Sequence, residues 1–338
     1  MESNPNNPRN MHRYRSVFRP GLFAGKVVMV TGGGSGLGRC TAHELVSLGA
    51  SVILIGRSLE KLETVRDELA EDYPESVERV GCYSCDIRDE ASVKQVVAAA
   101  LADFNRLDGL FNCAGGQFPA PLDKISLNGW DAVVRNNLHG TFLMSRECFT
   151  QWMRDHGGAI VNMLADIWGG MPGMGHSGAA RAGVWNFTET AACEWGYAGV
   201  RVNAVAPGWI ASAGMDSYDE RYRALLRELR HKVPLQRFGT ESELAAAAVF
   251  LLSEASAFIN GTVIRVDGGV PNARHSWPLA AAGRTLEFNG FSRYQPPVGL
   301  QDLIAAEDAK HSTDSTDSTD STDSTDSTDK AAPSSAGE

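Results

Sequence analysis

The chain has 338 residues and a formal net charge of −10, with 31 basic and 41 acidic side chains. Half of this charge lies in residues 310–338, where six Asp and Glu338 against Lys310 and Lys330 leave −5. An acidic balance argues against nucleic acid as a partner. The sequence has no apolar run of about 20 residues, which argues against a membrane span.

Residues 310–338 contain six tandem Ser-Thr-Asp triplets. Such a segment has no apolar side chains to offset the entropy of ordering, so we predict a disordered acidic tail. Residues 1–20 are rich in Asn, Pro and Arg and are expected to form a flexible arm. The remaining length suits a single α/β domain over residues 21–272, followed by a C-terminal extension over 273–309.

Six cysteines are scattered through apolar segments. Cys82 and Cys85 have the spacing of a metal or redox pair, but no second pair or nearby His supports such a site. We interpret them as small buried side chains and expect no metal. With no secretory leader in view, the sequence favours a reduced, cytoplasmic location.

Strand and helix patterns alternate along the whole domain. Short apolar runs predict strands at residues 26–31, 51–55, 80–85, 107–112, 159–163, 200–204 and 262–266. Helical spacing predicts helices at residues 36–48, 58–71, 90–104, 128–154, 177–194 and 240–252. This order indicates a doubly wound Rossmann fold with a seven-stranded parallel sheet and ligands at the carboxyl ends of the strands.

A glycine-rich turn joins the first predicted strand to the first helix. Glycines allow the backbone to approach a pyrophosphate closely, and the helix N-terminus supplies N–H donors. The position of the turn, after a strand and before a helix, is the context that a dinucleotide site requires. The residues predicted to bind cofactor here are Thr31, Gly32, Ser35, Gly36, Leu37 and Gly38.

The end of the second strand indicates which dinucleotide binds. An acidic residue there would bind a free ribose 2′-hydroxyl and repel a 2′-phosphate. The position holds Gly56, followed by Arg57. A guanidinium binds phosphate in a bidentate manner, so NADP (NADPH) is favoured. The alternative is that Arg57 is only a solvated turn residue.

Several further motifs, in order, resemble the short-chain dehydrogenase/reductase family. They are Gly32-x-x-x-Gly36-x-Gly38, Cys85-Asp86, Asn112-Cys113-Ala114-Gly115, Asn137-Leu138-His139-Gly140, Val200-Arg201-Val202-Asn203, Pro207-Gly208 and Asp267-Gly268-Gly269. The resemblance covers about residues 21–272. It implies that the cofactor also contacts Asp86, Ile87, Asn112, Ala114, Gly115, Arg181, Pro207, Gly208 and Ile210.

The sequence departs from this family at the catalytic positions. Most members carry a Ser and a Tyr-x-x-x-Lys segment, but here Ser177 and Arg181 take the Tyr and Lys positions, and Met163-Leu164-Ala165 offers no hydroxyl. A Ser hydroxyl is too weakly acidic to replace the phenol in alcohol oxidation, and Arg stays protonated. Reduction of a conjugated carbon–carbon double bond needs only donors that stabilise an enolate oxygen.

The departure itself is similar to the peroxisomal trans-2-enoyl-CoA reductases, with the dienoyl-CoA reductases as more distant relatives. The similarity lies in His176–Val184, Gly115–Phe118 and Trp152–Gly158. It implies NADPH-dependent reduction of a 2-enoyl-CoA, with an acyl-CoA substrate. Ser177 and Arg181 would stabilise the enolate, and Asn137 would hold a water. By resemblance, helices 128–154 and 177–194 would form the interfaces of a homotetramer or homodimer.

Other interpretations stay open. Asp166 either donates a proton near the substrate α-carbon or bonds the backbone as a turn residue. His176 either lines the pocket or is an ordinary polar neighbour. One rival function is a dehydrogenase for a prenyl or long-chain alcohol or aldehyde, with Asp166 or His176 as the base. The other is a catalytically silent NADP-binding oligomeric protein.

Overall fold

The computed structural model describes residues 12–217, 225, 228–273, 278–282 and 284–302. By its internal contacts the chain divides into Met1–Leu300 and Gln301–Glu338. All the elements below belong to the first of these units. The Ser-Thr-Asp tail and the first eleven residues lie outside the described residues, so the predictions made for them stay predictions.

A seven-stranded parallel sheet forms the centre of the fold, in the order β3-β2-β1-β4-β5-β6-β7. Its strands are β1 (Val27–Thr31), β2 (Ser51–Gly56), β3 (Val80–Ser84), β4 (Gly109–Asn112), β5 (Gly158–Met163), β6 (Val200–Pro207) and β7 (Val263–Val266). The order reverses direction at β1, so that β4 follows β1 on the side opposite β2. Such a switch point opens a crevice at the carboxyl ends of the strands. The predicted doubly wound fold is confirmed.

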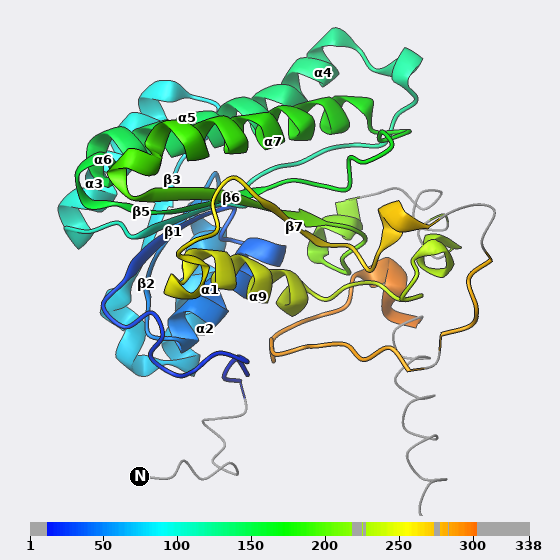
Figure 1. The fold of residues 1–338 in the computed structure, drawn as a ribbon. Coiled ribbons are helices and arrows are strands. Elements are labelled where there is room, and N and C mark those ends of the chain that lie inside the picture. Colours follow the sequence, from blue (N-terminus) through cyan, green and yellow to red (C-terminus); the bar gives the residue numbers. More distant parts are fainter. Residues whose placement is uncertain (1–11, 218–224, 226–227, 274–277, 283, 303–338) are drawn as a thin grey trace, which may run out of the picture. The chain divides into compact units, whose positions relative to one another are not determined.

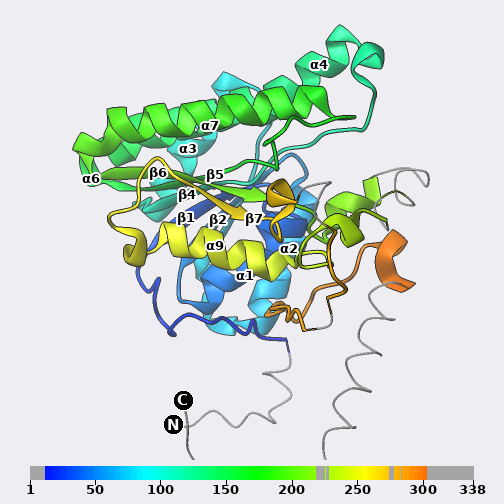
Figure 2. The ribbon, with the colours of Figure 1, turned by 45° about the vertical axis from the view of Figure 1, so that its right-hand side comes forward.

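Helices cover both faces of the sheet (Figure 1). They are α1 (Gly36–Ser47), α2 (Leu59–Asp72), α3 (Glu90–Phe104), α4 (Leu127–Val134), α5 (Gly140–Cys148), α6 (Arg154–His156), α7 (Gly175–Trp195) and α9 (Glu241–Leu252). Figure 2 shows α1, α2 and α9 below the sheet and α3 and α7 above it. Because both faces are covered, the central strands are mostly apolar and buried, as in β1, where all five residues are buried.

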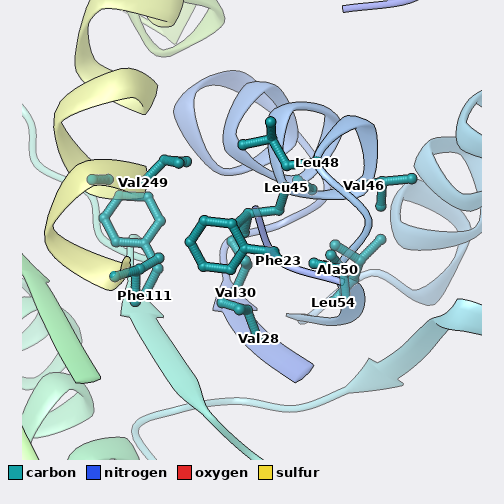
Figure 3. Packing of buried hydrophobic residues seen from close by; sticks show 14 of the residues in the cluster. Phe23, Val28, Val30, Leu45, Val46, Leu48, Ala50, Leu54, Phe111 and Val249 are labelled. Atoms are coloured by element: carbon teal, nitrogen blue, oxygen red, sulfur yellow. The ribbon is translucent and has the colours of Figure 1, made fainter. Parts of the chain in front are cut away.

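The core between the sheet and the lower helices is a continuous apolar cluster (Figure 3). Val30 of β1, Leu54 of β2 and Phe111 of β4 meet Leu45 of α1 and Val249 of α9. All five side chains are at most 1% exposed. This packing fixes α1, and with it the glycine-rich turn that precedes α1, against the ends of three strands.

The expected single helix over residues 128–154 is wrong in one respect, because two π-helical segments interrupt it. They are Arg135–His139 and Phe149–Met153. In the first, Asn137 donates from Nδ2 to the Val133 carbonyl at 2.9 Å, while Thr141 donates to the Asn137 carbonyl at 2.8 Å. Side chains that bond these carbonyls loosen the regular helical ladder, and π-bulges are frequent at functional sites.

The N-terminal arm and the C-terminal extension pack against each other. The arm is described from residue 12, and there the expected flexibility is replaced by buried contacts. Tyr14 stacks on Phe291 with ring centroids 6.1 Å apart, and both side chains are buried. The Arg15 amide donates to the Gly290 carbonyl at 2.8 Å. Both segments therefore belong to the same packed body as the sheet.

Within the described ranges, no helix has the length and apolar character needed to cross a bilayer. The six cysteines are free thiols; Cys85 is buried and Cys82 is half-buried. No group of three or more His, Cys, Asp or Glu in that same part of the chain is arranged to hold a metal ion.

Candidate active site

A cavity of about 1120 Å³ opens at the carboxyl ends of the strands. Its walls come from the segments that follow six strands: residues 32–38 after β1, 56–58 after β2, 85–87 after β3, 113–117 after β4, 164–166 after β5 and 207–210 after β6. This is where a doubly wound sheet binds its ligands. The volume exceeds the usual range for a single small-ligand pocket, about 300–1,000 Å³, and so suits two ligands side by side.

The glycine-rich turn is shaped for close approach of a ligand. Gly32 has a φ of +69°, and a Cβ there would lie 3.0 Å from the Ala114 Cα. A Cβ at Gly38 would lie 2.3 Å from the Gly32 carbonyl oxygen. Ser35 precedes α1 and makes no side-chain cap, so the first N–H groups of the helix stay available to an anion. These residues fit the pyrophosphate of a dinucleotide.

Two of the predicted cofactor residues support the turn from behind and do not line the cavity. Thr31 Oγ1 accepts the Ala114 N–H at 2.9 Å, which ties the end of β1 to the end of β4. Asn112 donates from Nδ2 to Ser145 Oγ at 2.8 Å and to Asn162 Oδ1 at 2.9 Å. Both residues are buried, so any contact between them and a ligand passes through their neighbours.

The nucleotide end of the cavity is basic. The exposed side chain of Arg57 lines it together with Lys61, at the N-terminus of α2. Asp86 also lines it, but its carboxylate is held by Arg88 at 2.6 Å. The hydrogen bonds from Arg88 lower the pKa of Asp86 to about 2. Asp86 therefore stays ionised, with its charge largely compensated.

Arg181 supplies a buried positive charge at the opposite end of the cavity. Its side chain lines the cavity from α7 and donates to the Met163 carbonyl. Burial lowers the pKa of Arg181 to about 10, which leaves the guanidinium protonated at neutral pH. A Cβ at Gly115 would lie 2.3 Å from Arg181 Nη2. A larger residue at position 115 would therefore displace this guanidinium.

Ser177 does not face the cavity. It is fully buried, and its hydroxyl donates to Gln117 Oε1. Gln117 does line the cavity, in the segment that follows β4. The structure thus places Gln117 where sequence analysis expected Ser177, with Ser177 orienting its carboxamide. The residues are 60 positions apart in sequence, so no local pattern indicates the contact.

Asn137 holds the same segment in place. Its Nδ2 donates to the Gly116 carbonyl at 2.8 Å, and its Oδ1 accepts the Gly116 N–H at 3.2 Å. The side chain is buried and does not line the cavity. Asn137 is therefore placed to fix the backbone between Gly115 and Gln117.

Asp166 lines the cavity directly after β5. Burial and the nearby Asp267 carboxylate raise its pKa, while the Trp168 N–H opposes the shift. Its Oδ1 is buried and has no hydrogen-bond partner among the described residues. A carboxyl with one unpaired buried oxygen favours the protonated form, which can donate a proton.

His176 packs behind the same wall. It is fully buried, lies outside the cavity lining and meets the edge of Phe118 with centroids 4.5 Å apart. Its Nδ1 accepts the Ser177 N–H at 2.9 Å. The structure therefore places His176 as a support for Ser177 and Phe118.

The predicted residues thus divide into two groups. The following line the cavity: Gly32, Ser35, Gly36, Leu37, Gly38, Arg57, Asp86, Ile87, Ala114, Gly115, Asp166, Arg181, Pro207, Gly208 and Ile210. Thr31, Asn112, Asn137 and Ser177 support them from behind. Sequence analysis assigned no role to Gln117, Lys61, Ser212 or Trp209, which also line the cavity. Two signals could have found Gln117: the rule that ligands bind at strand ends, and the similarity over Gly115–Phe118. Only the strand-end rule applies to Trp209.

Part of the cavity lining is apolar. It is formed by Met171, Met174, Trp209, Met215, Leu225 and Leu229. Methionine side chains are flexible and adapt to ligands of varied shape. This part of the lining suits an acyl or prenyl chain.

Comparisons with known proteins agree with this architecture. The family described as enoyl-(acyl carrier protein) reductase matches residues 32–271. A Bacillus subtilis protein described as probable 2,4-dienoyl-CoA reductase is 40% identical over 249 residues, which cover 72% of this chain and 96% of that protein. The peroxisomal 2,4-dienoyl-CoA reductase of Mus musculus is 35% identical over 286 residues, covering 82% of this chain and 94% of the mouse protein.

Among solved structures, the citronellol catabolism dehydrogenase (AtuB) of Pseudomonas aeruginosa is 56% identical, with a TM-score of 0.68. The match covers 76% of this chain and all of that one. The glycine-rich turn, the parallel sheet and these matches lead to one assignment. The chain belongs to the short-chain dehydrogenase/reductase superfamily of oxidoreductases, in the family described as enoyl-(acyl carrier protein) reductase.

Proposed function

We propose that this protein uses NADPH to reduce the carbon–carbon double bond of a 2-enoyl-CoA thioester. One observation carries the proposal: none of the described residues that line the cavity is a tyrosine. Ser177, at the position of the family's tyrosine, is buried behind Gln117. A site with this wall lacks a phenolic proton carrier for alcohol oxidation but keeps donors for an anionic oxygen.

The bound nicotinamide would supply a hydride to the β-carbon of the enoyl group. Negative charge then develops on the thioester oxygen. The Arg181 guanidinium and the Gln117 carboxamide both line the cavity and are donors suited to that oxygen. Ser177 fixes the carboxamide by donating to its Oε1, and Asn137 fixes the backbone beside it.

Asp166 is the proposed source of the proton for the α-carbon, directly or through a water. Its raised pKa keeps part of the population protonated at higher pH than for an ordinary aspartate. Solvent would return the proton to Asp166 after each turnover.

For the cofactor, Arg57 and Lys61 at the N-terminus of α2 support NADPH over NADH, because they can pair with a 2′-phosphate. For the assembly, we propose a homotetramer or homodimer built through α5 and α7. Phe142 of α5 is 40% exposed and meets Phe187 of α7.

A second candidate is oxidation of a prenyl alcohol or aldehyde. The 56% identity to a citronellol catabolism dehydrogenase favours it. In that reaction Asp166 would have to act as a base in its ionised form. The two functions therefore predict opposite pH profiles around the pKa of Asp166. Double-bond reduction slows as pH rises through it, and alcohol oxidation accelerates.

The deciding experiment follows nicotinamide absorbance with crotonyl-CoA, decenoyl-CoA, 2,4-dienoyl-CoAs, citronellal and citronellol. We expect NADPH to be consumed with enoyl thioesters and product analysis to show the saturated thioester. Rapid oxidation of citronellol with no enoyl reduction would reject the proposal in favour of the second candidate. Asp166→Asn should abolish the pH dependence in either case.

Variants of Gln117 and Ser177 test the roles proposed for these two residues. Gln117→Leu should lower kcat by about 10²–10³, the usual cost of losing one such donor. Ser177→Ala should lower kcat less, with the dissociation constant for NADPH unchanged. In the Gln117→Leu background, Ser177→Ala should add nothing, because it acts through Gln117. Additive losses in the double variant would show that Ser177 contacts the substrate itself.

A further inference from the structure

Glu241 is a buried carboxyl at the edge of the cavity that the mechanism above does not use. It is the first residue of α9, after the capping residue Thr240, and it is only 4% exposed. A Cβ at Gly36 would lie 3.7 Å from Glu241 Oε1, so the carboxyl faces the glycine-rich turn. It also accepts a hydrogen bond from the Ala213 N–H.

The Ala213 contact links the turn to the substrate side of the cavity. Ala213–Ser217 forms a 3₁₀ turn, and its Gly214 and Met215 line the cavity. The chain just before this turn is already fixed to Gly239, which donates to the Trp209 carbonyl at 2.9 Å. Glu241 therefore joins the cofactor turn to a wall of the substrate pocket.

The charges around Glu241 leave it poorly compensated. Arg39 of α1 is its positive neighbour, but Arg39 is held by Glu68 at 2.8 and 2.9 Å. Cys40 of α1 and Cys113 after β4 are nearby thiols whose pKa values are raised chiefly by burial and further by the Glu241 charge. Burial raises the pKa of Glu241 to about 7, and Arg39 and the Ala213 N–H only partly oppose this. The carboxyl therefore changes its charge near neutral pH.

We propose that Glu241 takes up a proton when the diphosphate of the dinucleotide binds at the glycine-rich turn, while its carboxyl keeps segment Ala213–Ser217 in position. Two negative groups close together in a buried site cannot both stay ionised without cost, and solvent supplies the proton. The neutral carboxyl still accepts the Ala213 N–H through its carbonyl oxygen. Glu241 is thus a positioning residue, and the inference rests on the proposed cofactor site.

Binding measurements test this without turnover. Titrations of NADPH and NADH between pH 6 and 9 would follow nicotinamide fluorescence in wild type, Glu241→Gln and Glu44→Gln. Glu44 is the matched control, because it too is a buried carboxyl with a pKa raised to about 7, but its oxygens bond Tyr14 and Ser16. NADH serves as a second control, since a phosphate monoester itself titrates near pH 6.

In wild type the dissociation constant should rise by up to about tenfold per pH unit above pH 7, as expected when one proton is taken up. Glu241→Gln should bind more tightly at pH 8 and lose this dependence, while Glu44→Gln should behave as wild type. Calorimetry in buffers of different ionisation enthalpy measures how many protons the protein takes up when NADPH binds. Glu241→Gln should take up about one proton fewer than wild type. If the dissociation constants of wild type and Glu241→Gln changed with pH in the same way, the proposed proton uptake by Glu241 would be wrong.

Hydrogen exchange tests the positioning. Amides of Ala213–Ser217 should exchange faster in Glu241→Ala, and at the wild-type rate in Glu241→Gln. Equal exchange in all three proteins would overturn the positioning role. Failure of every variant to bind NADPH would reject the proposed cofactor site and this inference with it. Normal binding without enoyl reduction would reject only the proposed substrate.

Discussion

At the scale of single residues, the two ends of the cavity differ in how far sequence predicts them. Arg57 and the glycines follow directly from the strand before them, because a parallel strand ends at the ligand edge of the sheet. At the catalytic end, Ser177 occupies the predicted helix but faces Gln117 instead of the cavity. Which side of a helix contacts a loop depends on packing between segments far apart in sequence.

Arg57 allows a direct test of cofactor choice. Arg57→Ala should raise the dissociation constant for NADPH about 10- to 100-fold, since hydrogen bonds to charged groups contribute about 1.5–3 kcal/mol. The dissociation constant for NADH should not change, because NADH carries no 2′-phosphate. Arg66→Ala is the control: Arg66 lies on the same helix, α2, and pairs with Asp67 and Glu63. If Arg57→Ala weakened the binding of NADH and NADPH equally, Arg57 would not contact the 2′-phosphate.

At the scale of elements, predicted boundaries were close wherever a strand or helix follows one uninterrupted periodicity. The helix over residues 90–104 was predicted as α3 has it. The helix over 128–154 was predicted without its π-helical segments, because these arise from side-chain bonds such as Asn137 to Val133 and Gly116. Gly116, which accepts the hydrogen bond from Asn137, lies in the loop after β4. Periodicity within the helix does not reveal a contact with this loop.

Helix α1 also carries a pH-dependent contribution to stability. Glu44 is fully buried and accepts hydrogen bonds from Ser16 and Tyr14. Burial raises its pKa from 4.5 to about 7. The folded chain therefore keeps this proton between about pH 4.5 and 7 while the unfolded chain loses it. In this window the folded state binds more protons, so the free energy of unfolding falls as pH rises.

Urea unfolding of wild type and Glu44→Gln at pH 5 and pH 8 measures this effect. The free energy of unfolding of Glu44→Gln relative to wild type should increase between the two pH values, by about 3 kcal/mol at most. Glu254→Gln provides the control, because Glu254 is exposed and its ion-pair partner among the described residues is the exposed Arg19. A difference between Glu44→Gln and wild type that stays constant with pH would contradict the assignment.

At the scale of the whole molecule, the segments outside the family match at residues 32–271 help to hold the domain together. Arg293 of the extension pairs with Asp72 at 2.7 Å and with Glu71 at 2.6 Å, at the end of α2. The Asp72 side chain is 1% exposed and lies 3.6 Å from His43 of α1. The extension therefore completes a largely buried ion pair at the end of α2, beside His43 of α1.

Arg293→Ala should lower the free energy of unfolding by about 3–5 kcal/mol, the usual cost of leaving one buried charge without its partner. Arg19→Ala removes the same side chain from an exposed pair with Glu254 and should cost less than about 1 kcal/mol. Chemical denaturation of the full-length chain compares the two. Equal effects would show that the extension adds no more than an ordinary surface contact.

The sequence by itself determined the doubly wound fold and which strand-end residues lie at the glycine-rich end of the cavity, because strand periodicity, turn glycines and strand-end positions are local properties of the chain. Only the tertiary structure decided that Gln117 lines the cavity and accepts a hydrogen bond from the buried Ser177. It also decided that Glu241 faces Gly36 and that Arg293 of the extension pairs with Asp72 of α2. The residues of each pair lie tens to hundreds of positions apart. Their contacts depend on how side chains fill the space between packed elements, which no pattern along the chain records.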